Sequence, residues 1–580
     1  MRKERFFWLI ICWSTILLST IACRNTSRSE NERNEPHVSA PKARVLNVQA
    51  FHAVGNGKAD DTKAIQTTIN AAQNGDTILI PPGIYRVKTL VLKSAIHIRG
   101  VGLLRQSLAQ DTQRYTRVIQ NSSTPLFFGR NIEQVSLSFF AETRNEALYI
   151  SNSKHIKINF TKIQGDRKKL YSFPGMLFYA CDSIQISHSS ISNYGAPRQS
   201  ASSYQAGTGI RFLSCQQIQI NDNEIIHNGE NGIFMHGSGR ATIHHNRISD
   251  NGMSAIQIGF GKTKREQHFI ISNNFLARNA ADAIDINNRI TPTPFPIYCT
   301  IRHNNSLENG FVQGQSTVDG SGLATLVNVS EVRLFKNQSR KSNRPALYLE
   351  KCGKILAEKN VSDNKVEIVH SFDTILLQQN KFDALTLLAH TQGKRLQLTD
   401  NTCRTLLFPN GVAIDSLLLI SNTLENASLN INMQGSLTLY KNTIHSEAPN
   451  GALLLTNIQG AQIKENSIKS TAGYAVTVNR SAQGIILEDN EIQSVEACVF
   501  DGGSENLTLL NNELRSLAGG RLQRTFISQH PNSLRLKGNT HRGGSSDNSI
   551  RLEGTGTAFI SDETIKSGYP DYGKVTVKEF

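Results

Sequence analysis

The stretch Ile218–Ile225 reads IQINDNEI, and a near copy, ILEDNEI, returns at Ile486–Ile492. Both copies place an apolar residue three positions before an asparagine. Recurrence of one pattern at a near-constant period is typical of a solenoid, in which each repeat stacks on the one before. Aligning the chain on this pattern puts fourteen asparagines in one register: Asn223, Asn246, Asn273, Asn304, Asn337, Asn360, Asn380, Asn401, Asn422, Asn442, Asn466, Asn490, Asn512 and Asn539.

The segments between these asparagines indicate strands. Most intervals are 20 to 24 residues long and contain short runs such as IRF and IQI, in which apolar and polar residues alternate. Leucine-rich repeats share this period, but their fixed leucine spacings are missing. We therefore predict an all-β, single-stranded right-handed parallel β-helix. Its asparagines should form one column at a turn, because asparagine tolerates left-handed backbone and its amide can bond to the rungs above and below.

The N-terminal end of this solenoid needs a cap, because an open rung exposes apolar surface and strand edges. The run Asp61–Gln73, DTKAIQTTINAAQ, has apolar residues at helical spacing after an aspartate, so we predict a capping helix there.

The run Phe51–Tyr85, FHAVGNGKADDTKAIQTTINAAQNGDTILIPPGIY, resembles the N-terminal signature of pectate-lyase-superfamily β-helix proteins. The matching letters are DDT, AIQ and PPG-Y, whereas His52 and Asn56 depart from the signature. The resemblance implies the β-helix fold, but the superfamily includes polysaccharide lyases, glycoside hydrolases, epimerases and phage tailspikes. Of the four motifs of polygalacturonase-type hydrolases, only Ala280–Asp285 echoes one, which argues against that subgroup.

The first residues have the layout of an export signal. Basic Arg2, Lys3 and Arg5 precede an apolar run that is too short to favour a stable membrane span. The run ends at Thr20–Cys23, TIAC, which resembles a bacterial lipobox whose Cys23 becomes lipidated; an uncleaved anchor or a plain secretory signal are the alternatives. We assign residues 1–22 to a signal peptide, 23–43 to a flexible tether, 44–565 to the β-helix and 566–580 to a C-terminal tail or cap. The expected location is the bacterial cell envelope, through a lipid anchor only.

The chain has a formal net charge of +15, which favours an acidic partner. No nucleic-acid-binding motif is present, so we expect an anionic polysaccharide as partner and a monomeric protein.

Insertions between rungs predict where the site lies. The intervals from Ser189 to Asn337 exceed most later ones, so extra residues must leave the stack as loops, and functional residues concentrate on such loops. We therefore place the site on rungs Gly209 to Thr325 and interpret the rungs from Asn337 onward as scaffold. The predicted loops are Tyr194–Thr208, Gly259–His268, Asn287–Tyr298 and Phe311–Gly322.

The strand phrases GIRF, GIFM, AIQI and AIDI predict which side chains line this site. Their third residues should point outward and face solvent. The resulting column is Tyr149, Leu177, Arg211, Phe234, Gln257, Asp285, Thr325 and Tyr348, flanked by His236 and Asn287 and preceded by Thr208, Asn231, Ser254 and Asp282.

Two chemistries fit these residues. In a hydrolase, Asp282 and Asp285 would divide the acid and the base or nucleophile roles. In a lyase or epimerase acting on a uronate, His236 would be the base and Arg211 the cation that stabilises the enolate, with Lys262, Lys264, Arg265 and Arg289 as further cations. Substrate contacts are expected from Phe234, Gln257, Asn287, Arg289, Lys262 and Tyr348. The alternative to an enzyme is a non-catalytic glycan-binding adhesin, which the missing family motifs favour.

No cofactor is expected, although calcium would fit if Asp282, Asp285 and Glu230 converge. The motifs of zinc sites are missing. Cys181 and Cys215 share a register and should stack on adjacent rungs, either bridged or as free thiols.

Overall fold

The computed structural model describes residues 43–101, 115–120, 122–168, 173–196, 207–259, 265–287, 295–311, 321–426, 428–517, 524–543 and 548–579. The predicted signal peptide with Cys23, the tether up to residue 42, and Lys262, Lys264 and Arg289 lie outside the described residues. The central parts of the four predicted loops do so as well.

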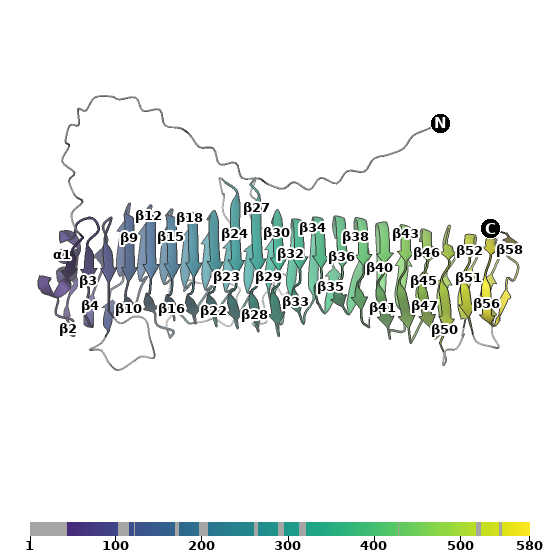
Figure 1. The fold of residues 1–580 in the computed structure, drawn as a ribbon. Coiled ribbons are helices and arrows are strands. Elements are labelled where there is room, and N and C mark those ends of the chain that lie inside the picture. The colour runs from purple at the N-terminus through teal and green to yellow at the C-terminus, as the bar shows by residue number, and fades with distance from the viewer. Residues whose placement is uncertain are drawn as a thin grey trace, which may run out of the picture. The chain divides into compact units, whose positions relative to one another are not determined.

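The described chain forms a parallel β-solenoid, which confirms the predicted all-β fold (Figure 1). Each middle rung contributes three short strands that pair in parallel with the rungs before and after. The first face consists of β8 (Phe127–Arg130), β11 (Leu148–Ser151), β14 (Met176–Tyr179), β17 (Ile210–Leu213), β20 (Ile233–His236), β23 (Ile256–Gly259), β26 (Ile284–Asn287) and β29 (Ala324–Val327).

The other two faces follow the same order along the chain. The second face contains β12 (Lys154–Asn159), β15 (Asp182–Ser187), β18 (Gln216–Asn221), β21 (Arg240–His244), β24 (Gln267–Ser272), β27 (Ile297–Arg302) and β30 (Glu331–Phe335). The third face contains β13 (Lys162–Gln164), β16 (Ser190–Ser192), β19 (Glu224–Ile226), β22 (Arg247–Ser249), β25 (Phe275–Ala277), β28 (Asn305–Leu307) and β31 (Gln338–Arg340).

In four rungs after Asn337 the first and second faces merge into long strands, namely β32 (Leu347–Glu358), β34 (Val366–Gln378), β38 (Thr405–Ile420) and β40 (Leu429–Tyr440). Pairing continues to β57 (Tyr569–Asp571) and β58 (Thr576–Lys578).

A helix lies at the N-terminal end, as the apolar spacing predicted. It is α1 (Thr62–Ala71), and Ile65 and Ile69 on it are fully buried. Its role as the cap of the solenoid stays a prediction. Among the described residues, no helix has the length and apolarity needed to cross a membrane.

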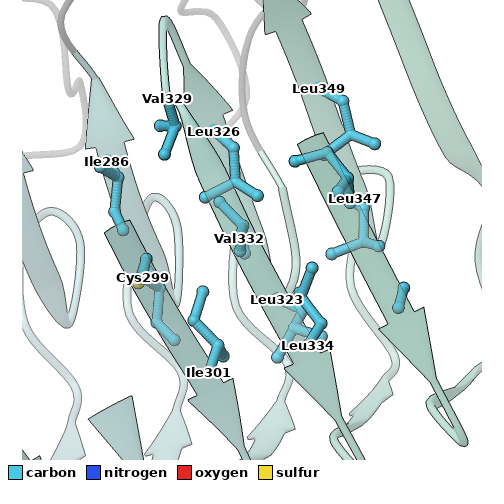
Figure 2. Close-up of a cluster of buried hydrophobic side chains, with 14 of the residues drawn as sticks. Ile286, Cys299, Ile301, Leu323, Leu326, Val329, Val332, Leu334, Leu347 and Leu349 are labelled. Atoms are coloured by element: carbon cyan, nitrogen blue, oxygen red, sulfur yellow. The ribbon is translucent and has the colours of Figure 1, made fainter. Parts of the chain in front are cut away.

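The interior of the solenoid consists of apolar columns (Figure 2). Ile286, Leu326 and Leu349 are strand partners on successive rungs, and all three are almost fully buried. Burying one such side chain stabilises the fold by roughly 1.5 to 3 kcal/mol. Because successive side chains of a strand point to opposite sides, every second residue lies in the core and the residues between them point outward.

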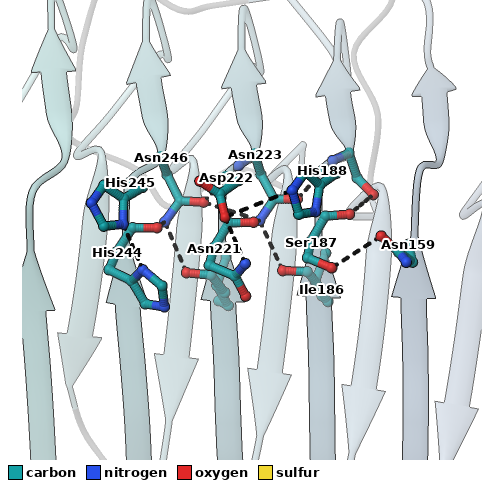
Figure 3. A network of polar contacts seen from close by, with 12 residues as sticks. Asn159, Ile186, Ser187, His188, Asn221, Asp222, Asn223, His244, His245 and Asn246 are labelled. Atoms are coloured by element: carbon teal, nitrogen blue, oxygen red, sulfur yellow. Dashed lines mark hydrogen bonds and ion pairs between the residues drawn. The ribbon is translucent and has the colours of Figure 1, made fainter. Parts of the chain in front are cut away.

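The asparagine column is a hydrogen-bonded ladder (Figure 3). Asn223 Nδ2 donates to the Ile186 carbonyl oxygen at 2.9 Å, and Asn246 Oδ1 accepts from the Asn223 backbone N–H at 3.0 Å. One predicted member is wrong: Asn274, not Asn273, occupies the ladder, with Oδ1 3.0 Å from the Asn246 backbone nitrogen. Asn273 instead adopts the left-handed backbone at the corner, with φ of 55°. Both adjacent asparagines fit the pattern of an apolar residue three positions before an asparagine, so that pattern alone did not identify the ladder residue.

The two cysteines predicted to stack do lie on adjacent rungs, since Tyr179 and Leu213, each two residues earlier, are strand partners. Both are buried free thiols. Burial raises the pKa of the Cys215 thiol, while a hydrogen bond with Cys215 lowers the pKa of Cys181.

Candidate functional site

A second, shorter asparagine ladder supports the middle rungs. Asn228 and Asn251 donate their backbone N–H groups to the Oδ1 atoms of Asn251 and Asn279, at 3.1 and 3.3 Å. Asn279 donates in turn to Asn309 Oδ1 at 3.0 Å. These residues follow the first ladder by a constant five positions, as in Asn223 and Asn228, a signal that the sequence contains and that we missed. The ladder fixes the turns that lead directly into the polar residues of the first face.

The outward column predicted on the first face is confirmed as a row of strand partners. Each residue pairs with its neighbour in the order Tyr149, Leu177, Arg211, Phe234, Gln257, Asp285, Thr325 and Tyr348. Residues far apart in sequence are thus neighbours along the axis, about 4.8 Å apart per rung.

The predicted solvent exposure of this column is wrong from Gln257 onward. Gln257, Asp285, Thr325 and Tyr348 are 3, 7, 2 and 2% exposed. The reason is that these polar side chains contact one another and residues outside the strands. Tyr348 also packs with Val327 and Val369 in a small apolar cluster separate from the core. Period-two reasoning identified the outward direction, but an outward side chain can still be covered.

Asp285 lies at the end of a chain of amide hydrogen bonds. Asn231 Nδ2 donates to Gln257 Oε1 at 2.8 Å, and Gln257 Nε2 donates to Asp285 Oδ2 at 2.9 Å. Asn231 is itself held, because its Oδ1 accepts the Ser254 backbone N–H at 3.0 Å. The chain fixes the position of the Asp285 carboxylate.

Asp282, just before β26, accepts hydrogen bonds from several donors. Its Oδ1 accepts from Thr325 Oγ1 at 2.8 Å and from the Ser321 backbone N–H. Its Oδ2 lies 3.4 Å from Arg344 Nη1 in a buried ion pair and 3.5 Å from Ser254 Oγ. Since Thr325 is also the strand partner of Asp285, both aspartates belong to one cluster.

Arg211 does not offer a free charge. Its Nη2 lies 2.7 Å from Glu230 Oε2 and 3.0 Å from Thr208 Oγ1, and its guanidinium lies over the Phe234 ring at 5.3 Å. Burial raises the pKa of the Glu230 carboxyl, and Arg211 and Thr208 oppose part of that shift. Arg211 is therefore paired with a buried carboxylate.

Three further predicted residues lie beside this cluster. His236, at the end of β20, is half-buried and stacks on Phe234 with ring centroids 6.4 Å apart. Burial lowers the pKa of His236, which favours the neutral form of its imidazole. Asn287 is half-buried two rungs further along the same column, since both His236 and Asn287 pair with Gly259. Tyr348 donates its hydroxyl to Glu350 Oε2 at 3.1 Å.

Arg344, Ser321 and Glu350 were not predicted as site residues. Arg344 lies 62 residues from Asp282, and no spacing in the sequence connects them. Arg344 and Glu350 lie beyond Asn337, so the rungs interpreted as pure scaffold contribute to the cluster. Among the residues that the structure describes, no group of three His, Cys, Asp or Glu side chains is arranged to hold a metal ion. Glu230 is bound to Arg211 instead of joining Asp282 and Asp285, and calcium stays a prediction of the sequence alone.

Comparison with known proteins agrees with this architecture. A family model described as "Rhamnogalacturonase A/epimerase, pectate lyase-like" matches residues 45–311. Together with the parallel β-solenoid, this match supports a relation to the pectate-lyase-like superfamily.

Curated relatives match over short segments. Alginate lyase 7 and mannuronan C5-epimerase AlgE1 of Azotobacter vinelandii are each 43% identical over 67 residues, which is 10% of this chain and 8% and 5% of theirs. The iota-carrageenase of Alteromonas macleodii is 33% identical over 101 residues, 16% of this chain and 21% of that protein. The chain thus spans only a small part of the length of these relatives.

Solved structures match over longer stretches at low identity. The A-module of the A. vinelandii mannuronan C-5 epimerase AlgE4 is 14% identical, with 67% of this chain and 97% of that chain covered and a TM-score of 0.33. DFA-IIIase from Arthrobacter chlorophenolicus A6 is 13% identical, with 67% and 94% covered and a TM-score of 0.38. A likeness at this level supports no conclusion about function.

Proposed function

We propose that this protein is a carbohydrate-active enzyme that cleaves an anionic polysaccharide by hydrolysis on the first face of its middle rungs. The observation that carries the proposal is that Asp282 and Asp285 belong to one cluster. Thr325 donates a hydrogen bond to the Asp282 carboxylate and is the strand partner of Asp285. Glycoside hydrolysis requires two carboxyl groups with different environments on either side of the scissile bond. The names of the matched relatives, an alginate lyase, mannuronan epimerases and a carrageenase, support a polysaccharide substrate.

The two environments suggest how the roles divide. Asp282 is held by a guanidinium, a hydroxyl and a backbone N–H, all of which stabilise the ionised carboxylate, so it suits the base or nucleophile. We assign Asp285, whose Oδ2 accepts from the Gln257 amide, to the role of the acid that protonates the leaving glycosidic oxygen. Half-buried Phe234, His236 and Asn287 would contact the sugar rings next to the bond.

Elimination is the second candidate, favoured by His236. A neutral imidazole next to an aromatic ring could remove the proton at C5 of a uronate. Elimination also needs a cation at the substrate carboxylate. Arg211 and Arg344, the guanidiniums that contact the described cluster, are each paired with a carboxylate of the protein, which makes this chemistry the weaker fit.

The deciding experiment incubates the protein with alginate, polygalacturonate, iota-carrageenan and the neutral glucan dextran. New reducing ends without ultraviolet absorption of an unsaturated product support hydrolysis. Absorption of an unsaturated product supports elimination, and binding with neither product supports the glycan-binding adhesin.

We also propose that the chain is exported and anchored to the bacterial envelope by lipidation of Cys23. The basic start, the apolar run and the sequence TIAC support this location.

A further inference from the structure

A groove on the second face lies apart from the carboxylate cluster. It has a volume of about 480 Å³ and crosses β12, β15, β18, β21 and β24. Its floor is an outward column of strand partners on successive rungs, Lys157, Gln185, Gln219, Thr242 and Ile270. The volume falls within the usual range of ligand sites, about 300 to 1,000 Å³.

One wall of the groove consists of side chains on strained backbone. His155, Ser183 and Gln217 occupy the same position on three successive rungs, with φ of 54°, 55° and 51°. In rungs outside the groove the same position holds Gln134, Gly460, Gly484 and Asn506, all at positive φ. Left-handed backbone costs a residue with a side chain about 1 to 2 kcal/mol, a cost that glycine avoids. The position thus accepts glycine and other residues alike, so glycine can replace the three groove residues without straining the backbone.

The lining of the groove combines two cations with several side-chain amides. Its described lining contains Lys157, Arg240, His155 and His268 but no carboxylate. Two glutamates lie beside the lining histidines, Glu133 at 3.7 Å from His155 and Glu266 at 3.3 Å from His268. Cationic groups bind carboxylate or sulfate, and glutamine amides bind hydroxyl groups.

The groove also offers apolar contact to a sugar ring. Ile270 is 40% exposed at its floor, and Tyr298 stacks on His268 with centroids 4.9 Å apart. Because the rungs repeat every 4.8 Å or so, a linear polymer along the axis meets equivalent positions on each rung.

We propose that this groove is a second binding site for an anionic polysaccharide. It lies on a different face from Asp282 and Asp285, so it holds a separate stretch of polymer and does not take part in bond cleavage. Its ligand is a linear chain that carries carboxylate or sulfate groups.

The test measures binding of the whole protein to alginate, iota-carrageenan and dextran by affinity electrophoresis and calorimetry. All proteins carry Asp285→Asn, so that turnover cannot confuse the result. The first groove variant combines His155→Gly, Ser183→Gly and Gln217→Gly, the residue that two later rungs carry at this position as Gly460 and Gly484. We expect its Tm to stay the same or rise, and its Kd for an anionic polymer to increase at least tenfold.

A second variant, Lys157→Ala with Arg240→Ala, should lose binding to the same extent and show a weaker dependence on salt. The matched control is Arg535→Ala, which removes a cation from the same strand position at the far end of the solenoid and should leave Kd unchanged. The proposal is overturned if both groove variants bind within twofold of the parent, if Arg535→Ala weakens binding equally, or if the parent binds none of the anionic polymers. The first two outcomes leave the proposed hydrolysis standing, because product formation is measured separately in proteins that keep both Asp282 and Asp285. A parent that binds none of the anionic polymers would count against both proposals.

Discussion

Thr325 Oγ1 donates a 2.8 Å hydrogen bond to Asp282 Oδ1 across 43 residues of sequence, while Thr325 itself stacks directly on Asp285. One threonine thus links the two aspartates of the cluster. Solenoid stacking brings this about, because a position on one rung is always next to the same position on the following rung.

Replacing either aspartate should remove turnover. Asp282→Asn and Asp285→Asn each keep the shape of the side chain but lose the carboxyl group, and a general acid or base contributes roughly 10²- to 10⁴-fold to the rate. Product formation would be measured on whichever polymer the protein cleaves. Asp489→Asn, an exposed carboxylate in the later rungs, is the control and should keep full activity. If both cluster variants keep more than half of the parent's turnover rate, the two aspartates are not the catalytic residues.

Arg344 should stabilise the protein through Asp282. Arg344→Met leaves a buried carboxylate without its guanidinium, and breaking such a pair costs about 3 to 5 kcal/mol. The double variant with Asp282→Asn should lose much less than the sum of the single losses, since no charge remains unpaired. Thermal unfolding of the four proteins measures the coupling, and additive changes in stability would contradict it.

His236 gives a pH test of the two chemistries. Its pKa is lowered by burial, so the folded protein keeps the imidazole neutral to a pH below the ordinary value of 6.5. If His236 is the base of an elimination, kcat/KM should fall only below pH 6.5, and His236→Gln should abolish the reaction. If the aspartates hydrolyse the substrate, the His236→Gln variant should still show the fall of kcat/KM at low pH. A profile measured from pH 4 to 9 separates the two results.

The asparagine ladder should contribute to stability one rung at a time. Asn401 donates to the Leu377 carbonyl oxygen at 2.8 Å and accepts from the Asn380 backbone at 2.9 Å. Asn401→Ala leaves buried backbone groups unpaired, which costs about 1 to 3 kcal/mol. Asn430→Ala changes an exposed asparagine nearby and should be close to neutral. Equal shifts in Tm for the two variants would mean that the ladder is not what holds the turn.

Cys23→Ser should release the protein from the envelope. A serine cannot take the lipid, so the mature chain would move from the membrane fraction to the soluble exported fraction. Metabolic labelling with a fatty acid provides the direct check, and unchanged fractionation together with absent labelling in the parent would point to a plain secretory signal.

Much of the fold could be predicted because the repeat is local. The period of the asparagines and the alternation within phrases such as AIQI fix the rung length, the strand register and the inward residues. The same register correctly made Gln257, Asp285 and Thr325 strand partners. The error at Asn273 arose because two adjacent asparagines suit both the corner and the ladder, although the constant spacing of five to Asn279 points to Asn274.

The environment of the cluster could not be predicted in the same way. Arg344 reaches Asp282 from the turn that follows β31, and no periodic rule in the sequence states which side chain of that turn meets the cluster. The exposure of Asp285 was misjudged for a related reason, since an outward direction does not say what covers the side chain.

Sequence by itself determined the stack: the period, the faces and which distant residues become neighbours, because these follow from repeated short-range preferences. Only the tertiary structure decided which charges are already paired, as Arg211 is with Glu230 and Arg344 with Asp282, and which side chains are buried. Those properties depend on irregular turns and on long side chains, whose positions are set by packing and by the cost of leaving a charge without a partner.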